Sequence, residues 1–403
     1  MTSSRATLIF AVVVAAIGYF VDLYDIVIFG VVRVASLTEL GIAGDDITTW
    51  GVRLFNLQMA GMLIGGFAWG AIGDVFGRRV ALIATISVYS AANIANAYIG
   101  SVEQYAVLRF LAGFGLAGEL GAGVTLVAEL LPKNLRGYGT TVISFLGLVG
   151  AVTASRIGGH FDWRTAYLAG GLLGVVVLIG RVIGLRESEI FSEHKGQSGQ
   201  GNVLLLLHPP ARLARFLAVV AIGVPIWYVS ALFVTLAPEL GAALELSAPL
   251  RVADVLLYQA IGLAIGSALS GLISEWMQSR KRILYLCFAA LVALTLVLMK
   301  AGTPAAYCEI MFVVGLAQGY WTAFITLATE QFGTNIRATV STSVPNLVRA
   351  MTIPITLALT ALKTDWGLIP TTLALGALVY GLAFVALASL PETYGKDLNY
   401  IEP

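Results

Sequence analysis

The sequence predicts an all-α integral membrane protein with twelve transmembrane helices in two six-helix bundles, and its composition is the first reason. Of its 403 residues, 58% are hydrophobic and 12% are charged, whereas an average soluble domain carries about 25% charged residues. The mean hydropathy is +0.87. Because a membrane-spanning helix needs roughly 20 apolar residues in succession, this content is enough for about a dozen spans. A disordered chain, a disulfide-rich secreted scaffold and a cytosolic enzyme all fit this composition poorly.

The second reason is the spacing of the apolar runs. Runs of suitable length lie near 7–30, 52–73, 79–99, 104–131, 138–159 and 165–185, and then near 212–236, 252–274, 283–300, 305–329, 339–361 and 367–389. The first run lacks a small-residue cleavage site, so we interpret it as a span rather than a signal peptide. The only long polar stretch is charged and then rich in Gly, Gln and Ser, as flexible linkers are. We predict an N-terminal bundle at 1–185, a cytoplasmic linker at 186–211, and a C-terminal bundle with a short cytoplasmic tail at 212–403.

The third reason is an internal repeat. The segment 70–74 with Arg79 recurs as 271–275 with Arg280, an offset of 201. Glu129 and Arg136 recur at the same offset as Glu330 and Arg337. Two six-helix halves in parallel repeat are the architecture of many secondary transporters, which rock about a central site.

The distribution of charge predicts the orientation and limits the partners. With the N-terminus inside, the cytoplasmic loops hold twice as many Lys and Arg residues as the opposite side, as the positive-inside rule requires. Both termini are therefore expected in the cytoplasm. We expect the membrane to be a bacterial inner membrane. The formal net charge of +1 implies no nucleic-acid partner. Cys287 and Cys308 lack the spacing of a metal site or redox pair, and we expect no cofactor and no metal. We also expect the chain to function as a monomer.

One loop carries the most specific motif. Residues 70–79 read GAIGDVFGRR at the predicted cytoplasmic turn between the second and third spans. Glycines allow a tight turn there, and Asp74 is placed to pair with arginines when the cytoplasmic side is closed. A merely basic inner loop would explain the arginines but not the spacing of Gly and Asp. The candidate cytoplasmic gate consists of Gly70, Asp74, Gly77, Arg78, Arg79, Glu129, Arg136, Glu275, Glu330 and Arg337.

This loop resembles the G-x-x-x-D-x-x-G-R-R/K signature of the major facilitator superfamily, and the resemblance covers the whole chain. It implies alternating access between two six-helix halves. Asp22-x-Tyr24-Asp25 and Gly118-Glu119 resemble motifs of the metabolite:proton symporters, although no Trp follows the first acid and Ala117 replaces one glycine. Phosphate:proton symporters also carry aspartates in the first span. The tail 391–396, PETYGK, is similar to the ending of sugar porters.

Ionisable residues inside the spans are the candidates for proton coupling, because each costs several kcal/mol unless it is paired or wet. Asp22 and Asp25 are three residues apart and share a helix face about halfway across. Two such close carboxylates do not both ionise easily, which suits a proton carrier. Glu119 lies near the midplane, and Arg109 resembles the superfamily's span-four arginine. For Glu119 and Arg109 the alternative is a structural ion pair. The matching stretch 221–228 has no acid, which places proton handling in the N-terminal half.

The cargo is the least determined property. A guanidinium in a cavity suits a carboxylate, and polar or aromatic side chains deep in the spans are candidates to line a cavity. The candidate substrate-binding residues are Arg109, Tyr24, Arg349, Trp227, Tyr320 and Gln318. We expect proton-coupled uptake of a small organic anion or zwitterion. The alternative is a multidrug or cation:proton antiporter, although the fifth span lacks the Gly-Pro pair usual there. No nucleophile–base set, metal cluster or extramembrane domain indicates an enzyme.

Overall fold

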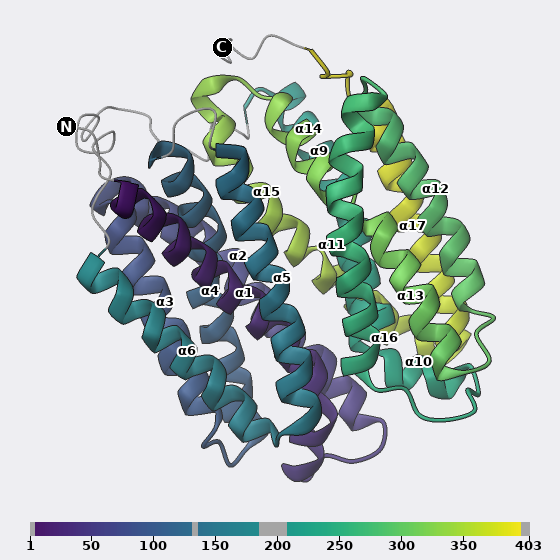
Figure 1. The fold of residues 1–403 in the computed structure, drawn as a ribbon. Coiled ribbons are helices and arrows are strands. Elements are labelled where there is room, and N and C mark those ends of the chain that lie inside the picture. Colours follow the sequence, from purple (N-terminus) through teal and green to yellow (C-terminus); the bar gives the residue numbers. More distant parts are fainter. Residues whose placement is uncertain (1–4, 131–135, 185–207, 396–403) are drawn as a thin grey trace. The chain divides into compact units, whose positions relative to one another are not determined.

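The computed structural model describes residues 5–130, 136–184 and 208–395, which form long helices joined by short connections (Figure 1). The chain divides into two compact units, Met1–Gly201 and Asn202–Pro403, called unit 1 and unit 2 below. The boundary falls inside the predicted linker, which itself lies almost entirely outside the described residues.

Unit 1 contains one helix for each of the six predicted spans. These helices are α1 (Arg5–Glu39), α2 (Asp46–Phe76), α3 (Arg78–Asn96), α4 (Val102–Leu130), α5 (Arg136–His160) and α6 (Trp163–Gly184). A single residue, Gly77, separates α2 from α3 and has φ of +104°. Because side chains are strained at this φ, glycine is required at this turn.

In unit 2 the same number of spans is built from more pieces. They are α9 (Pro210–Val229) with the π-helical turn η1 (Ser230–Thr235), α10 (Ala237–Ala243), α11 (Val252–Trp276), α12 (Arg280–Leu298), α13 (Pro304–Gln318), α14 (Trp321–Glu330), α15 (Thr334–Ala350), α16 (Thr352–Trp366) and α17 (Leu368–Ser389). The break between α13 and α14 lies at Gly319, where an added Cβ would stand 2.0 Å from the backbone of Gly266. Pro225 in α9 and Pro345 in α15 each remove a backbone donor from the helix interior.

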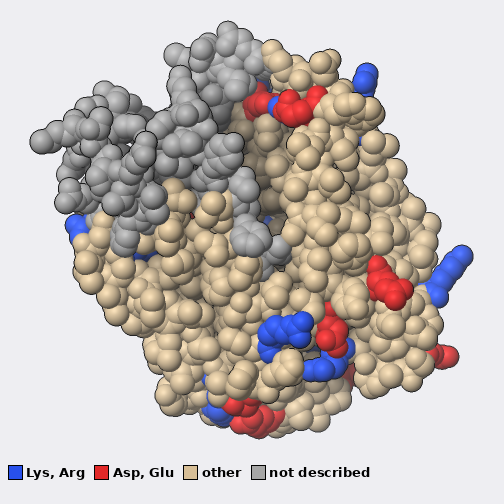
Figure 2. Space-filling model, in the orientation of Figure 1, with Lys and Arg blue, Asp and Glu red and all other residues tan. Residues whose placement is uncertain are grey.

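The described helices present apolar side chains on their outer surfaces. Eight helical segments among the described residues are long and apolar enough to cross a membrane. Ile183 is 80% exposed, and Leu272 and Val385 are each 69% exposed. Side chains of Lys, Arg, Asp and Glu are sparse on the face drawn in Figure 2. Such extensive exposed apolar surface is unfavourable in water, so the surrounding medium is lipid.

The sequence repeat is also a repeat of helix contacts. In unit 1, a Cβ on Gly61 of α2 would lie 2.1 Å from the carbonyl oxygen of Phe110 on α4. In unit 2, a Cβ on Gly262 of α11 would lie 2.0 Å from the carbonyl oxygen of Phe312 on α13. Gly61 and Gly262 are again 201 positions apart. Each pair of helices therefore packs backbone against backbone at a small residue, as helices do in lipid.

These contacts predict a sharp difference between glycines. Gly61→Ala and Gly262→Ala each force two helices apart and should lower the free energy of unfolding by about 1–3 kcal/mol, the usual range for overpacking. Gly180→Ala is the matched control, because no atom lies within 4 Å of its Cβ position. That change should be neutral or stabilising, since alanine favours a helix by up to about 1 kcal/mol. Melting temperatures of the purified variants check this, and equal losses in all three would contradict it.

Candidate functional site

Three helices of unit 1 bring polar side chains to Asp25 on α1. Its carboxylate accepts hydrogen bonds from Gln58 Nε2 of α2 at 2.8 Å and from Asn93 Nδ2 of α3 at 2.6 Å. Arg109 Nη1 of α4 lies 3.4 Å from both carboxylate oxygens. Asp25, Gln58 and Arg109 are fully buried, and Asn93 is 1% exposed. We call these four residues the Asp25 cluster.

The cation of this cluster is held away from the acid. Arg109 Nη2 donates to Asn93 Oδ1 at 2.5 Å, and its Cζ lies 4.6 Å from the ring centre of Tyr167 on α6. A charge-assisted hydrogen bond from a guanidinium to a carboxylate is normally about 2.7–2.9 Å long. The short bonds to Asp25 therefore come from neutral amides, whereas its bonds to the arginine are long.

Glu119 on α4 has a different environment. Arg181 of α6 grips it with both terminal nitrogens, Nη1 to Oε1 at 2.7 Å and Nη2 to Oε2 at 2.5 Å. Thr85 of α3 donates to Oε1 at 2.7 Å, and Arg181 also donates to the carbonyl oxygen of Leu82. The geometry favours the structural-pair alternative for Glu119, and separates it from Arg109.

The two other polar candidates on α1 are buried as well. Asp22 is fully buried one turn before Asp25. The Tyr24 hydroxyl donates to the carbonyl oxygen of Ala166 on α6 at 2.7 Å, and the side chain has no exposure. The Tyr24 hydroxyl therefore links α1 to the backbone of α6, and its expected contact with the substrate stays a prediction.

In unit 2, Gln318 and Tyr320 flank the break between α13 and α14 and are fully buried. Gln318 Nε2 donates to the carbonyl oxygen of Ile226 at 3.0 Å, and its Oε1 accepts from Gln259 Nε2 at 2.7 Å. The Tyr320 hydroxyl donates to the carbonyl oxygen of Ile222 at 3.0 Å. Both therefore tie the broken helix to α9 on either side of Pro225. The expected substrate contacts of Gln318 and Tyr320 stay predictions.

Arg349 and Trp227, which were predicted separately, meet in unit 2. The Arg349 Cζ of α15 lies 5.5 Å from the ring centre of Trp227 on α9. Arg349 is 2% exposed and Trp227 is 9% exposed. A desolvated guanidinium over an indole ring is a favourable pair, and it combines the two groups that an aromatic carboxylate would need.

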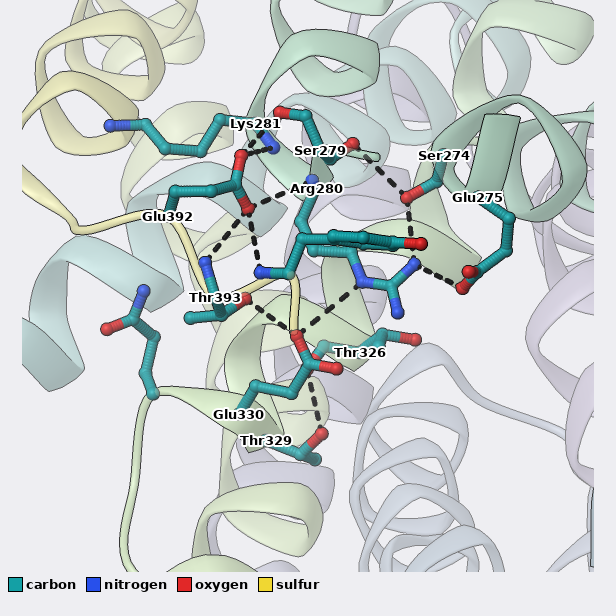
Figure 3. Close-up of polar contacts among 12 residues, drawn as sticks. Ser274, Glu275, Ser279, Arg280, Lys281, Thr326, Thr329, Glu330, Glu392 and Thr393 are labelled. Atoms are coloured by element: carbon teal, nitrogen blue, oxygen red, sulfur yellow. Dashed lines mark hydrogen bonds and ion pairs between the residues drawn. The ribbon is translucent and has the colours of Figure 1, made fainter. Parts of the chain in front are cut away.

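The candidate gate of unit 2 forms a polar cluster where α11, α12, α14 and the tail meet (Figure 3). Arg280 Nη1 donates to Glu275 Oε1 at 2.7 Å, and its Nε lies 3.5 Å from Glu330 Oε2. The Thr393 hydroxyl donates to Glu330 at 2.6 Å. Among the described side chains, Glu330 therefore pairs with Arg280.

Less can be said of the gate in unit 1. Arg79 Nη2 donates to the carbonyl oxygen of Val182 near the end of α6 at 3.1 Å, and Gly77 forms the turn already described. The other predicted gate side chains lie outside the part of the chain whose side chains the structure describes: Gly70, Asp74, Arg78, Glu129, Arg136 and Arg337.

The carboxylate of Glu392, in the segment after α17, caps the N-terminus of α12. It accepts hydrogen bonds from the Ser279 hydroxyl and from the backbone N–H groups of Arg280 and Lys281. Burial would raise its pKa, but these bonds outweigh burial and lower the pKa from 4.5 to about 2. Because the folded-state pKa is depressed, this stabilisation is complete above about pH 4.5 and is lost as the pH falls toward 2.

We therefore expect Glu392→Gln to lower the free energy of unfolding by about 1 kcal/mol at pH 7, a modest value because the site is partly exposed. The difference from the wild type should shrink toward zero between pH 4.5 and pH 2, as the wild-type carboxylate becomes protonated. Melting temperatures of both proteins across this range check the prediction. A difference that stays constant with pH would contradict it.

Several residues of the site were missed from sequence. Gln58, Asn93, Tyr167 and Arg181 are neutral or lie near span ends, so none stood out as a buried charge. One signal was available, because Gln58 and Gln259 are 201 positions apart. Gly113 packs on the backbone of the first and Gly315 on that of the second, so the two glutamines occupy equivalent places.

Two bundles of lipid-exposed helices, with buried ionisable groups clustered in one of them, define a multi-pass membrane transporter rather than an enzyme. The sequence profile of the Major Facilitator Superfamily matches residues 15–350, so the chain belongs to that superfamily. This confirms the predicted family and its twelve-helix fold.

Similar proteins refine this picture. A putative metabolite transport protein of Haemophilus influenzae is 25% identical over 96% of this chain and 97% of its own. The niacin transporter NiaP of Acinetobacter baylyi and the 4-hydroxybenzoate transporter PcaK of Pseudomonas aeruginosa are each 29% identical. Those two matches cover 41% and 48% of this chain, and only 38% and 44% of the relatives' own lengths.

Solved structures agree on the fold. The xylose transporter XylE from E. coli, in a partially occluded inward-open conformation, superposes with a TM-score of 0.73 at 16% identity, covering 98% of this chain and 100% of that one. A crystal structure of a D-xylose-proton symporter gives a TM-score of 0.74 at 17% identity, with the same coverage. At such identity the likeness concerns the fold alone.

Proposed function

We propose that this protein takes up a small organic anion, most specifically an aromatic carboxylate, together with a proton. The observation that carries the proposal is the Asp25 cluster, a buried carboxylate whose short hydrogen bonds come from neutral amides and whose arginine is held 3.4 Å away. Relatives named for 4-hydroxybenzoate, niacin and gentisate support the aromatic acid.

The chemistry of uptake follows from charge balance. When Asp25 is ionised, it neutralises Arg109. A proton on Asp25 removes that negative charge and leaves a buried cation, which favours an anion in its place because an uncompensated buried charge is costly. Proton and anion binding thus stabilise each other, as symport requires. Unit 2 separately contains the Arg349–Trp227 pair, whose guanidinium and indole ring have chemistry that suits a carboxylate and an aromatic ring.

The setting follows the sequence-based orientation. We place the protein in a bacterial inner membrane with both termini in the cytoplasm, acting as a monomer. Cysteine-accessibility labelling of the tail and of the connection between α1 and α2 in intact cells tests the orientation, and labelling of the tail from outside would contradict it.

Uptake by reconstituted protein tests the proposed function. Liposomes with an alkaline interior should accumulate radiolabelled 4-hydroxybenzoate, nicotinate or gentisate, and a protonophore should abolish accumulation because it removes the proton gradient. Parallel liposomes are loaded with a hydrophobic cation such as ethidium. Proton-driven export of ethidium, with no uptake of any of the acids, would overturn the proposal in favour of the antiporter.

A further inference from the structure

The aromatic ring of Tyr167 lies beside Arg109 and has no role in the charge balance proposed above. It lies 4.6 Å from the guanidinium carbon and is fully buried on α6. Among the described residues, the guanidinium contacts the carboxylate of Asp25, the amide oxygen of Asn93 and this ring. Cation–π attraction is strongest where water is excluded.

A chain of hydrogen bonds orients the ring. The Ser36 hydroxyl donates to the carbonyl oxygen of Arg33, so its oxygen is left to accept from Tyr105. Tyr105 then accepts in turn from the Tyr167 hydroxyl, at an oxygen–oxygen distance of 2.5 Å. The direction of each bond follows from the single proton on each hydroxyl.

Tyr105 is itself fixed. Its ring meets that of Tyr167 edge to face, with centres 5.8 Å apart, and it stacks near Trp163 at 6.3 Å. The Trp163 indole N–H donates to Glu39 at the end of α1. The position of the Tyr167 ring is therefore determined by three helices and not by its own rotamer alone.

Unit 1 offers an internal comparison. Arg181 has no ring contact in the described structure and closes on Glu119 at 2.5 Å and 2.7 Å, whereas Arg109 has one and stays at 3.4 Å from Asp25. Both pairs are almost completely buried. The longer distance thus accompanies the guanidinium that has a ring and an amide oxygen beside it.

We propose that Tyr167 is a positioning residue for coupling, because its ring holds the Arg109 guanidinium back from Asp25 at a distance that lets Asp25 gain and lose a proton. This inference rests on the proposed proton-coupled function. Besides Arg109 and Tyr167, the ionisable groups around Asp25 whose side chains the structure describes are Asp22 and Tyr24 on α1, Tyr89 on α3 and Tyr105 on α4. The neighbour from α2 is the neutral Gln58.

Two substitutions separate the ring from its hydroxyl. Tyr167→Phe keeps the ring, whereas Tyr167→Leu removes it and lets the guanidinium close on Asp25. Tyr307→Leu in unit 2 is the control for loss of a buried tyrosine, since Tyr307 is equally buried and bonds only to a backbone carbonyl oxygen in the described structure. Asp25→Asn defines the part of any pH dependence that belongs to Asp25.

The first readout needs no substrate. The melting temperature of each purified protein is measured from pH 5 to pH 9. The part of its pH dependence that disappears in Asp25→Asn is assigned to Asp25, and the midpoint of that part is compared between the variants. For Tyr167→Leu, the midpoint of this part should move to more acidic pH by about one unit, the lower end of the effect of a close opposite charge. Tyr307→Leu should keep the wild-type midpoint. Tyr167→Phe keeps the ring but loses the hydroxyl that orients it, so it should shift the midpoint by less than Tyr167→Leu does.

The second readout is transport of 4-hydroxybenzoate in liposomes. Tyr167→Leu should lower the initial rate of pH-driven uptake about tenfold, the change in population that corresponds to one pH unit, while retaining counterflow exchange, which needs no net proton movement. A wild-type midpoint in Tyr167→Leu, or an equal shift in Tyr167→Phe, overturns the inference about the ring. If Asp25→Asn leaves both the pH dependence and the accumulation intact, the proposed coupling function itself fails, whatever Tyr167 does.

Discussion

Replacing Asp25 by asparagine should abolish pH-driven accumulation of the substrate and leave counterflow exchange intact. Asparagine keeps the size of the side chain and can still meet Gln58 and Asn93, but it cannot carry a proton. For one proton per anion, the wild type should accumulate substrate about tenfold per unit of imposed pH gradient, because a tenfold ratio corresponds to one pH unit. The variant should reach a ratio of about one, measured with radiolabelled 4-hydroxybenzoate in liposomes.

Asp22→Asn is the matched comparison, because Asp22 is equally buried on the same helix. Arg109 is paired with Asp25, so we expect the larger loss of accumulation in the Asp25 variant. Full accumulation by Asp25→Asn together with its loss in Asp22→Asn would assign the proton to Asp22. Full accumulation by both variants would remove this pair of acids from the coupling step.

Glu119→Ala should destabilise the protein by about 3–5 kcal/mol, the usual cost of leaving one member of a buried ion pair uncompensated. Arg181 is 1% exposed, and in this variant its buried guanidinium would have no carboxylate partner at Glu119. The double variant Glu119→Leu with Arg181→Met should recover most of the lost stability, because apolar residues of similar size often replace a buried pair without loss. Melting temperatures of the three proteins measure both effects.

The same variants decide whether Glu119 takes part in transport. If the pair is structural, the double variant should accumulate substrate with wild-type pH dependence once it is folded and reconstituted. A stable double variant that exchanges substrate but no longer accumulates it would instead show that Glu119 takes part in proton coupling. A double variant as unstable as the single one would contradict the expectation that apolar side chains can replace this pair.

Much of the fold was accessible from sequence because lipid imposes a simple rule on it. A span must be a long apolar helix whose backbone is satisfied internally, so each predicted run corresponds to a helix or a helix pair in the structure. The breaks within spans of unit 2 were less accessible. The one at Gly319 depends on how closely the backbone of Gly266 approaches, and no local sequence pattern encodes that distance.

The candidate site divides in the same way. Asp25 and Arg109 stood out because a charge in a span needs a reason. Their partners did not, since Gln58 and Asn93 are ordinary neutral residues until helices α2 and α3 bring them to Asp25. Tyr24 and Tyr320 were attractive as deep aromatic side chains, yet backbone carbonyl oxygens of neighbouring helices take their hydroxyl protons.

The sequence by itself determined that this chain spans a membrane, that it repeats, and which few charges are buried, because hydropathy and charge are local properties of the chain. Only the tertiary structure decided how those charges pair. Glu119 and Asp25 are both acids buried in spans, but one is gripped at 2.5 Å by Arg181 and the other is held 3.4 Å from Arg109. That difference depends on which side chains six helices bring together, and it separates a structural ion pair from the candidate proton carrier.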